Sequence, residues 1–344
     1  MLVRNQWYVA AWTGEIGREL LARTVCGEPL VMFRREDGSV AALEDRCWHR
    51  LAPLSMGKLV GDEVECGYHG LVFNGAGACV RMPNGGSIPP AACVRSYPVV
   101  ERHRFVWVWV GEAERADPDL IPDLPWNDHP DWVGEGGRLP VKADYRLLID
   151  NLMDLTHETY LHPETIGHDA LSAAPIDTES DAGSVTVTRW TEGIDPPPFW
   201  KMAIGREGLC DRWQFIRFMP PAAIAIDVGV ALAGTGARGG DRSQGVTGFV
   251  INFLTPETET TSHYFWNFVR DFDRGNAALT WTMTETTTRV FMQDVTMLEA
   301  QQRALSAVPD ATLRNLNIDA GGVRARRLID RLHKQHQVPA MAAE

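Results

Sequence analysis

The first third of the chain alternates short hydrophobic segments with turn residues. The segments are rich in β-branched and aromatic residues and are separated by Gly, Pro, Asp or Asn, which is typical of short antiparallel strands. The clearest segments are 6–11, 30–34, 40–44 and 104–110. Asp37-Gly38 and Asn74-Gly75 indicate hairpin turns. Residues 1–115 are therefore predicted to form an all-β domain.

The chain is long for a single hydrophobic core, and its pattern changes after residue 115. With 344 residues, two domains are expected. The strand pattern ends with Phe-Val-Trp-Val-Trp-Val at 105–110, which is apolar on both faces and is predicted to be covered on both sides. The acidic and proline-rich residues that follow predict a linker over 116–140 and a second domain over 141–344.

The second domain combines several strand patterns with one long helical pattern. Strand-like segments lie at 185–191, 213–218, 223–231, 248–254 and 262–270. Between 280 and 305 the composition is helical, and Val290, Asp294 and Leu298 recur every four residues. An antiparallel sheet wrapped around a long helix, the helix-grip arrangement, accounts for both patterns. The chain as a whole is predicted to be α+β.

Composition excludes several classes of function. The chain has 33 basic and 45 acidic residues, a formal charge of -12, and no cluster of Lys and Arg, so no nucleic-acid partner is expected. No apolar run approaches a membrane span and no signal segment is visible, so we expect a cytoplasmic protein without a membrane partner. Six cysteines do not make a disulfide framework, and four of them are interpreted as small apolar residues: Cys26, Cys79, Cys93 and Cys210.

Two short segments near the front of the chain each offer one cysteine and one histidine. The first is Cys47-x-His49 and the second, sixteen residues later, is Cys66-x-x-His69. A structural zinc site usually takes its cysteines from one loop and its histidines from another. A Rieske [2Fe–2S] cluster instead needs two Cys on one iron and two His on the other. The mixed pairing favours a Rieske cluster, with a Cys2His2 zinc site as the alternative.

A second group of candidate ligands lies between residues 151 and 163. Helical spacing would place Asn151, Asp154 and either His157 or Glu158 along one side of a helix. His162 lies five residues after His157, and Pro163 pushes it out of the helical region, so it could turn back toward a shared metal. The alternative is a capped helix end with satisfied histidines.

Asp294 is the candidate third ligand for such a metal. It lies within an apolar stripe of the predicted long helix, and an ionised carboxylate buried there needs a cation opposite it. Iron that binds O2 takes two imidazoles and one carboxylate, leaving positions open. We therefore expect His157, His162 and Asp294 to hold a mononuclear Fe(II). A buried Asp that pairs with an Arg or caps a helix remains the alternative.

The sheet around the helix is expected to enclose a cavity for an aromatic substrate. Its polar lining is predicted to include Asn252, His263 and Trp281. The run Gly-Thr-Gly-Ala-Arg-Gly at 234–239 matches the dinucleotide fingerprint by letter, but no βαβ unit surrounds it. It is interpreted as a loop between strands, and no nicotinamide or flavin site is expected in this chain.

Together the two constellations resemble the Rieske non-heme iron oxygenases, in the branch of vanillate O-demethylase and dicamba monooxygenase. The resemblance covers nearly the whole chain and is carried by residues 3–10, 151–157 and 254–259. It implies that the cluster ligands are Cys47, His49, Cys66 and His69. It likewise implies that the catalytic iron is held by His157, His162 and Asp294.

The resemblance also implies an electron path and partners. Asp154 would bridge a cluster histidine of one subunit to an iron-ligating histidine of the next, which implies a homotrimer. Asn151 would lie beside the iron without binding it. A separate reductase, with or without a ferredoxin, would deliver electrons from NADH. Where dicamba-type enzymes grip the substrate with a histidine, this chain has Asn252, whereas Trp281 resembles an aromatic residue of their pocket.

These inferences lead to a functional hypothesis. The chain is expected to be the oxygenase component of a monooxygenase that uses O2 to O-demethylate a methoxylated, vanillate-like aromatic acid and release formaldehyde. One alternative is hydroxylation of a methyl or N-methyl group on another aromatic, such as an arylsulfonate. Ring dihydroxylation is a further rival. From a different class, a non-catalytic electron carrier or zinc-binding module also remains open.

Overall fold

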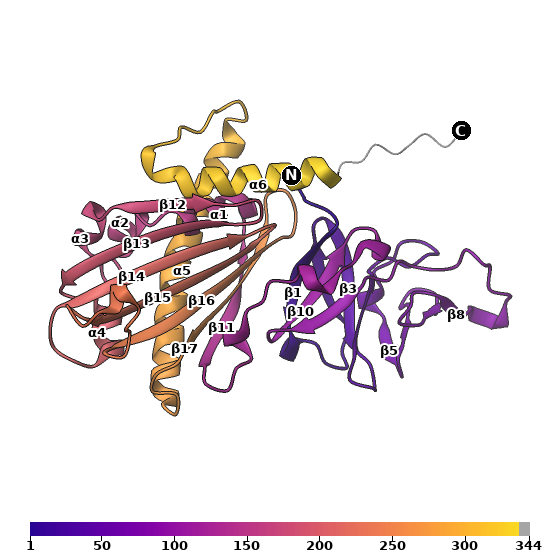
Figure 1. Cartoon of the computed structure of the whole chain (residues 1–344). Coiled ribbons are helices and arrows are strands. Elements are labelled where there is room, and N and C mark those ends of the chain that lie inside the picture. Colours follow the sequence, from indigo (N-terminus) through magenta and orange to yellow (C-terminus); the bar gives the residue numbers. More distant parts are fainter. Residues whose placement is uncertain (337–344) are drawn as a thin grey trace. The chain divides into compact units, whose positions relative to one another are not determined.

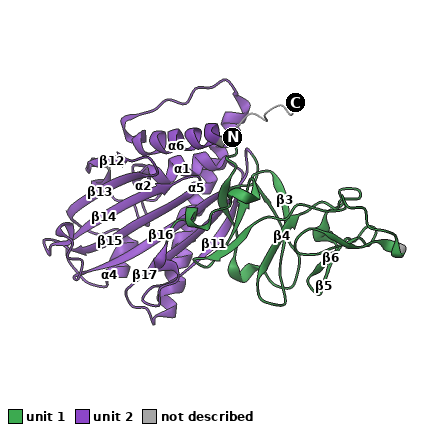
Figure 2. Cartoon of the chain, turned by 45° about the vertical axis from the view of Figure 1, so that its right-hand side comes forward, with its two compact units in different colours: residues 1–123, 255–258 green, residues 124–254, 259–344 purple. Residues whose placement is uncertain are grey.

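The computed structural model describes residues 1–336, which fall into two compact units (Figure 2). Unit 1 comprises residues 1–123 and 255–258, and unit 2 comprises 124–254 together with the chain from 259 onward. Unit 1 is all β apart from short 3-10 turns, and unit 2 contains a large antiparallel sheet with helices. The predicted α+β class, with the all-β part first, is confirmed.

Unit 1 contains three small sheets. Their strand orders are β1-β10-β9, β2-β3-β4 and β5-β6-β7-β8. The strands are β1 (Gln6–Trp12), β2 (Leu21–Val25), β3 (Glu28–Arg34), β4 (Val40–Glu44), β5 (Lys58–Val60), β6 (Glu63–Glu65), β7 (Val72–Phe73), β8 (Cys79–Arg81), β9 (Val99–Arg102) and β10 (Phe105–Val110). All six residues of β10 are buried, as its pattern predicts. One core cluster joins Phe33, Leu43 and Phe73 to Cys47 and Cys66.

Unit 2 is built on a seven-stranded antiparallel sheet with the order β11-β17-β16-β15-β14-β13-β12. Its strands are β11 (Val133–Val141), β12 (Ile176–Ser180), β13 (Val185–Ile194), β14 (Cys210–Met219), β15 (Ala223–Leu232), β16 (Gly245–Pro256) and β17 (Ser262–Arg270). The segment that resembled a dinucleotide fingerprint lies in the connection between β15 and β16, so its interpretation as a loop is confirmed.

Six α-helices occur among residues 1–336, and one of them is long. They are α1 (Tyr145–Met153), α2 (His157–Leu161), α3 (Asp169–Ala173), α4 (Pro198–Ile204), α5 (Ala277–Ala307) and α6 (Ala320–His336). Figure 1 shows α5 running across the strands of the sheet. Asn276 caps α5 by accepting a hydrogen bond from the Leu279 N–H at 2.9 Å. Within the described residues no helix has the length and apolarity needed to cross a membrane.

Helix α6 packs against α1, which leads into the predicted ligand segment. A Cβ at Gly321 would stand 2.9 Å from the carbonyl oxygen of Met153, and a Cβ at Gly322 would stand 2.9 Å from Oδ1 of Asp150. Arg326 adds an ion pair to Asp150, with Nε 2.8 Å from Oδ1. The two glycines therefore let α6 approach the last turn of α1 closely.

Strand β11 occupies residues that the sequence predicts as the end of the linker. It pairs with β17 over its whole length. The strand was missed because glycines replace the alternating side chains that identify a strand. Glycine is required here, since a Cβ at Gly134 would lie 1.8 Å from the Phe268 carbonyl oxygen and one at Gly136 would lie 1.9 Å from that of Trp266.

Replacing Gly136 by alanine is predicted to lower the free energy of unfolding by about 1–3 kcal/mol, because β11 must move away from β17. Gly137→Ala is the matched control, since its Cβ would meet the Trp266 side chain at 3.4 Å, an ordinary contact distance. Thermal and denaturant unfolding of both variants measure the difference. Equal stability of the two variants would contradict this account of the glycines.

Candidate active site

Two loops of unit 1 carry one Cys and His pair each, and the two loops have the same pattern of backbone hydrogen bonds. The N–H of Cys47 donates to the carbonyl of Ala52, and the Leu51 N–H donates back to the carbonyl of Cys47. The second loop repeats this pattern at the same spacing, with Cys66 bonded to Leu71 and Gly70 bonded to Cys66. The residue four positions after each cysteine has a positive φ, +58° at Leu51 and +74° at Gly70. Each loop therefore turns sharply between its cysteine and the next strand.

The four candidate cluster ligands differ in burial by residue type. Cys47 and Cys66 are buried, whereas His49 and His69 are exposed with ring centroids 4.7 Å apart. Burial, with a smaller contribution from the neighbouring Cys66 thiol, raises the pKa of the Cys47 thiol to about 11. Two inner thiols and two outer imidazoles fit a [2Fe–2S] cluster whose inner iron takes sulfur and whose outer iron takes nitrogen.

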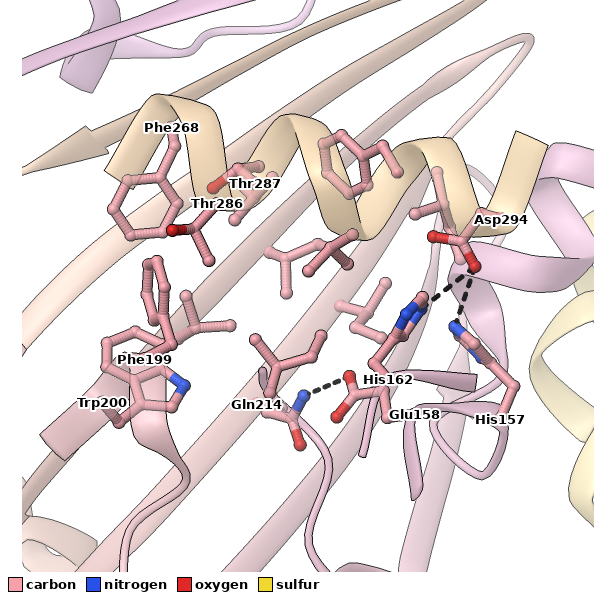
Figure 3. A pocket seen from close by; sticks show the side chains of 18 of the residues that line it. His157, Glu158, His162, Phe199, Trp200, Gln214, Phe268, Thr286, Thr287 and Asp294 are labelled. Atoms are coloured by element: carbon pink, nitrogen blue, oxygen red, sulfur yellow. Dashed lines mark hydrogen bonds and ion pairs between the residues drawn. The ribbon is translucent and has the colours of Figure 1, made fainter. Parts of the chain in front are cut away.

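In unit 2, His157, His162 and Asp294 come together at one point. One ligand atom from each lies within 4.8 Å of the others. Nε2 of His162 is 3.2 Å and Nε2 of His157 is 3.5 Å from Oδ1 of Asp294. Figure 3 shows both imidazoles directed at the carboxylate on α5. This trio, two imidazoles and one carboxylate, has the donor chemistry that a mononuclear iron with open positions requires.

The local backbone differs from the single helix that the sequence spacing predicts. α1 ends at Met153, Asp154 is extended with φ -100° and ψ 123°, and α2 begins at His157. The Asp154 carboxylate accepts a hydrogen bond from the Thr156 N–H at 2.7 Å, which closes the turn between the helices. His162 leaves α2 with φ -122° and ψ 39°, outside the α region that the following proline disfavours.

Hydrogen bonds at Nδ1 fix how both imidazoles are turned. Nδ1 of His157 lies 2.7 Å from the carbonyl oxygen of Asp154, and Nδ1 of His162 lies 2.7 Å from Oε1 of Gln293. Because both partners are acceptors, Nδ1 carries the proton in each ring and Nε2 is left to face Asp294. Gln293 was missed from the sequence, although its place next to Asp294 on a helix was a usable signal.

Two further polar side chains, Asn151 and Asp154, lie next to members of the trio. Asn151 donates from Nδ2 to Oδ1 of Asp294 at 3.0 Å, so it lies beside the carboxylate. Burial alone would raise the pKa of Asp154, but hydrogen bonds from His157 and Thr156 outweigh it and hold that pKa below its ordinary value. Burial opposes protonation of His157, yet Asp154 and the carboxylate of Asp294 raise its pKa overall.

A buried ionic network behind the histidines was also missed. Glu158, next to His157, accepts hydrogen bonds from Arg189 at 2.9 Å, Arg212 at 3.2 Å and Gln214 at 2.6 Å. Burial lowers the pKa of Arg212 to about 10. The network ties α2 to strands β13 and β14. Sequence could not identify it because its members lie far apart in the chain.

A pocket extends from the trio along the space between α5 and the sheet (Figure 3). Asp154 and the trio line one end. Apolar side chains form most of the remaining wall: Leu152, Ile166, Phe199, Ile216, Ile226, Val228, Val250, Phe268, Val290 and Phe291. Trp200, Thr286 and Thr287 lie at the end remote from Asp294. The shape and lining fit a planar apolar ring with one end at the trio.

The three residues predicted as polar lining do not line this pocket. Asn252 is fully buried and bonded to the Tyr264 hydroxyl at 2.8 Å. His263 alternates on β17 with residues that contact α5, so it faces the opposite side of the sheet. Trp281 is 67% exposed. It lies thirteen residues before Asp294 on α5, and this spacing places its side chain about 220° around the helix axis from Asp294, away from the pocket.

Comparison with known proteins accounts for both units. Residues 6–98 match the Rieske [2Fe-2S] domain, and residues 141–335 match the vanillate O-demethylase oxygenase C-terminal domain. The vanillate O-demethylase oxygenase subunit of a Pseudomonas species is 44% identical over 348 residues, covering 100% of this chain and 98% of that protein. The chain belongs to the vanillate O-demethylase family of Rieske oxygenases.

Other relatives of this Rieske oxygenase act on different aromatics. The toluene-4-sulfonate monooxygenase system iron-sulfur subunit of Comamonas testosteroni is also 44% identical, covering 97% of this chain and 98% of its own. The crystal structure of dicamba monooxygenase bound to 3,6-dichlorosalicylic acid superposes with a TM-score of 0.91 at 35% identity, covering 96% and 98% of the two chains. The chain is therefore an oxygenase component whose cofactors are a Rieske [2Fe–2S] cluster and a mononuclear non-heme iron.

Gln293→Leu is predicted to weaken metal binding by this Rieske oxygenase about 10- to 100-fold, because His162 loses the acceptor that fixes its orientation. Gln293→Glu keeps an acceptor at Nδ1 and should retain binding. Gln301→Leu, an exposed position on the same helix, is the control. Titration of metal-depleted protein with Fe2+ or Co2+ gives the affinities. Unchanged affinity in Gln293→Leu would contradict the positioning role.

Proposed function

We propose that this oxygenase removes the methyl group of a methoxylated, vanillate-like aromatic acid as formaldehyde. One observation carries the proposal: the trio lies at one end of an otherwise apolar pocket, in a chain 44% identical over its full length to a vanillate O-demethylase oxygenase subunit. A ring seated in that pocket presents one substituent to the trio. Hydroxylation of a methoxy carbon there gives a hemiacetal, which collapses to a phenol and formaldehyde.

The ligand roles follow from the donor sets. Cys47, His49, Cys66 and His69 hold the cluster, and the trio holds the iron. When bound, the iron supplies O2 activation and the cluster supplies electrons. The chain's own residues supply geometry: Gln293 and the backbone of Asp154 turn the imidazoles, and Asn151 positions the carboxylate without binding metal. The apolar wall excludes water from the reacting methyl group.

Asp154 links the two centres in this proposal. Its carboxylate lies at the trio, within 3.8 Å of Nδ1 of His157, and about a fifth of its side chain is exposed. From that position it accepts a hydrogen bond from a cluster histidine of a neighbouring subunit, so the working form is a homotrimer. A separate reductase, with or without a ferredoxin, passes electrons from NADH to the cluster.

A second candidate reaction is hydroxylation of a methyl group on an arylsulfonate. It is favoured by the toluene-4-sulfonate monooxygenase subunit, which is as similar to this chain as the vanillate relative is. Both reactions place a methyl carbon at the trio. They differ in the product, since an aryl methyl group yields a benzylic alcohol and no formaldehyde.

Formaldehyde is predicted to form in step with NADH consumption when the enzyme, with a surrogate reductase, is given methoxybenzoates. The assay runs over a panel of methoxybenzoates and tolyl acids, including toluene-4-sulfonate, with chromatography of the aromatic products. Benzylic alcohols from the tolyl acids, without formaldehyde from any methoxybenzoate, would exclude O-demethylation and support the second reaction.

Asp154→Asn is predicted to abolish turnover while iron and acid-labile sulfide stay near wild-type amounts. The amide retains the oxygen that accepts the Thr156 N–H, so the turn should form, but it lacks the charge that pairs with a histidine. Asp177→Asn, an exposed position on β12, is the control. Metal and sulfide analysis accompany the turnover assay. Wild-type turnover in Asp154→Asn would disprove this electron path.

A further inference from the structure

The end of the pocket remote from the trio carries polar groups that the metal site does not use. Trp200 on α4 is 2% exposed, and its indole Nε1–H has no hydrogen-bond acceptor. Figure 3 shows the ring at the opposite end of the pocket from Asp294, with its nitrogen turned inward. A buried donor without an acceptor is costly, and a ligand that brings an acceptor to this end of the pocket would satisfy it.

Thr287 on α5 provides a second unused polar group, a hydroxyl, at the same end of the pocket. Six of the seven threonines in α5 donate to the carbonyl four residues earlier: Thr280, Thr282, Thr284, Thr286, Thr288 and Thr296. Among the described threonines of α5, Thr287 is the exception, because its side chain makes no hydrogen bond. It is buried on the face of α5 that lines the pocket. Its hydroxyl is therefore available to a ligand.

Arg212 on β14 supplies a third donor, and this one is charged. Its terminal nitrogens bond to Glu158 and to the carbonyl of Ile166, but its buried Nε–H has no acceptor. The Phe199 N–H donates to the carbonyl of Thr165, so α4 and Arg212 approach the same short loop. Among the described side chains that line the pocket, the buried nitrogen atoms without a partner are both donors, Nε1 of Trp200 and Nε of Arg212.

We propose that Trp200, Thr287 and Arg212 form an oxyanion subsite for the acid group of the substrate, and so determine its specificity. The indole Nε1–H and the guanidinium Nε–H can only donate, and the Thr287 hydroxyl can also donate, which matches an acceptor such as a carboxylate or sulfonate and not a cation. The ring then lies against the apolar wall, with its methyl-bearing end at the trio. This inference rests on the proposed function and extends it by naming the residues that select aromatic acids.

Binding without turnover tests the subsite. Iron-loaded protein is titrated calorimetrically under anaerobic conditions with 4-methoxybenzoate, with toluene-4-sulfonate, and with 4-methoxytoluene, which has no acid group. The variants are Trp200→Phe and Thr287→Val, which remove one donor each and largely keep shape. The controls are Thr288→Val, whose hydroxyl is already bonded to the Thr284 carbonyl, and Trp190→Phe, and neither residue lines the pocket.

Each subsite variant should weaken binding of the acids by about tenfold or more, as expected when a charged acceptor loses a hydrogen bond. Binding of 4-methoxytoluene should not change, and both controls should behave as wild type. The tighter of the two acids identifies the oxyanion as carboxylate or sulfonate. Equal weakening for acids and 4-methoxytoluene, or no weakening of acid binding, would overturn the subsite.

Failure of the proposed function can be told apart from failure of the subsite. If the acids bind through Trp200 and Thr287 but the wild-type enzyme forms no formaldehyde from methoxybenzoates, O-demethylation is excluded and the subsite is supported. If the wild-type enzyme forms formaldehyde but neither substitution weakens acid binding, O-demethylation is supported and the subsite is excluded. Wild-type protein that binds neither acid also excludes the subsite.

Discussion

The constraint that organises unit 2 is the burial of the Asp294 carboxylate. It is 3% exposed on a helix face packed against a sheet, where an ionised group is costly unless cationic or hydrogen-bonding partners meet it. Those partners come from 132 residues earlier, where the chain stops one helix and starts another so that His157 and His162 can face α5. Neutral imidazoles alone do not balance the charge, whereas a divalent metal between the three groups would.

The two candidate metal sites are built in opposite ways. In unit 1 the candidate ligands lie close together in the sequence. Two loops with the same backbone hydrogen bonds each present one buried thiol and one exposed imidazole, and of these four residues only the cysteines belong to the hydrophobic core. In unit 2 the site depends on tertiary structure, since the carboxylate, the glutamine that orients His162 and the network around Glu158 come from separate elements. Motifs of the first kind are visible in a sequence, and contacts of the second kind are not.

The sequence therefore predicted the β-rich first unit, most strands of the second and the long helix, because side-chain alternation and helical spacing identify them. It missed β11, where glycines that accommodate β17 remove the alternation. It grouped His157, His162 and Asp294 from ligand chemistry, but assumed one helix where an Asp154 turn separates two. It misassigned His263 and Trp281 because strand face and helical phase, not residue type, decide which side chains reach the pocket.

Helix α5 carries the candidate metal ligand Asp294 near its middle. Residues of the same helix about two turns earlier, Thr286 and Thr287, line the pocket. Its threonines are short, and all of them except Thr287 bond to their own backbone, so among the described threonines of α5 only the Thr287 hydroxyl is left for a ligand in the pocket. Changes at positions 286–290 can therefore reshape the room for a ring while the spacing of the ligand positions is kept. In such a layout, a substitution in this stretch would alter which aromatic ring fits and would leave the positions of the candidate metal ligands in place.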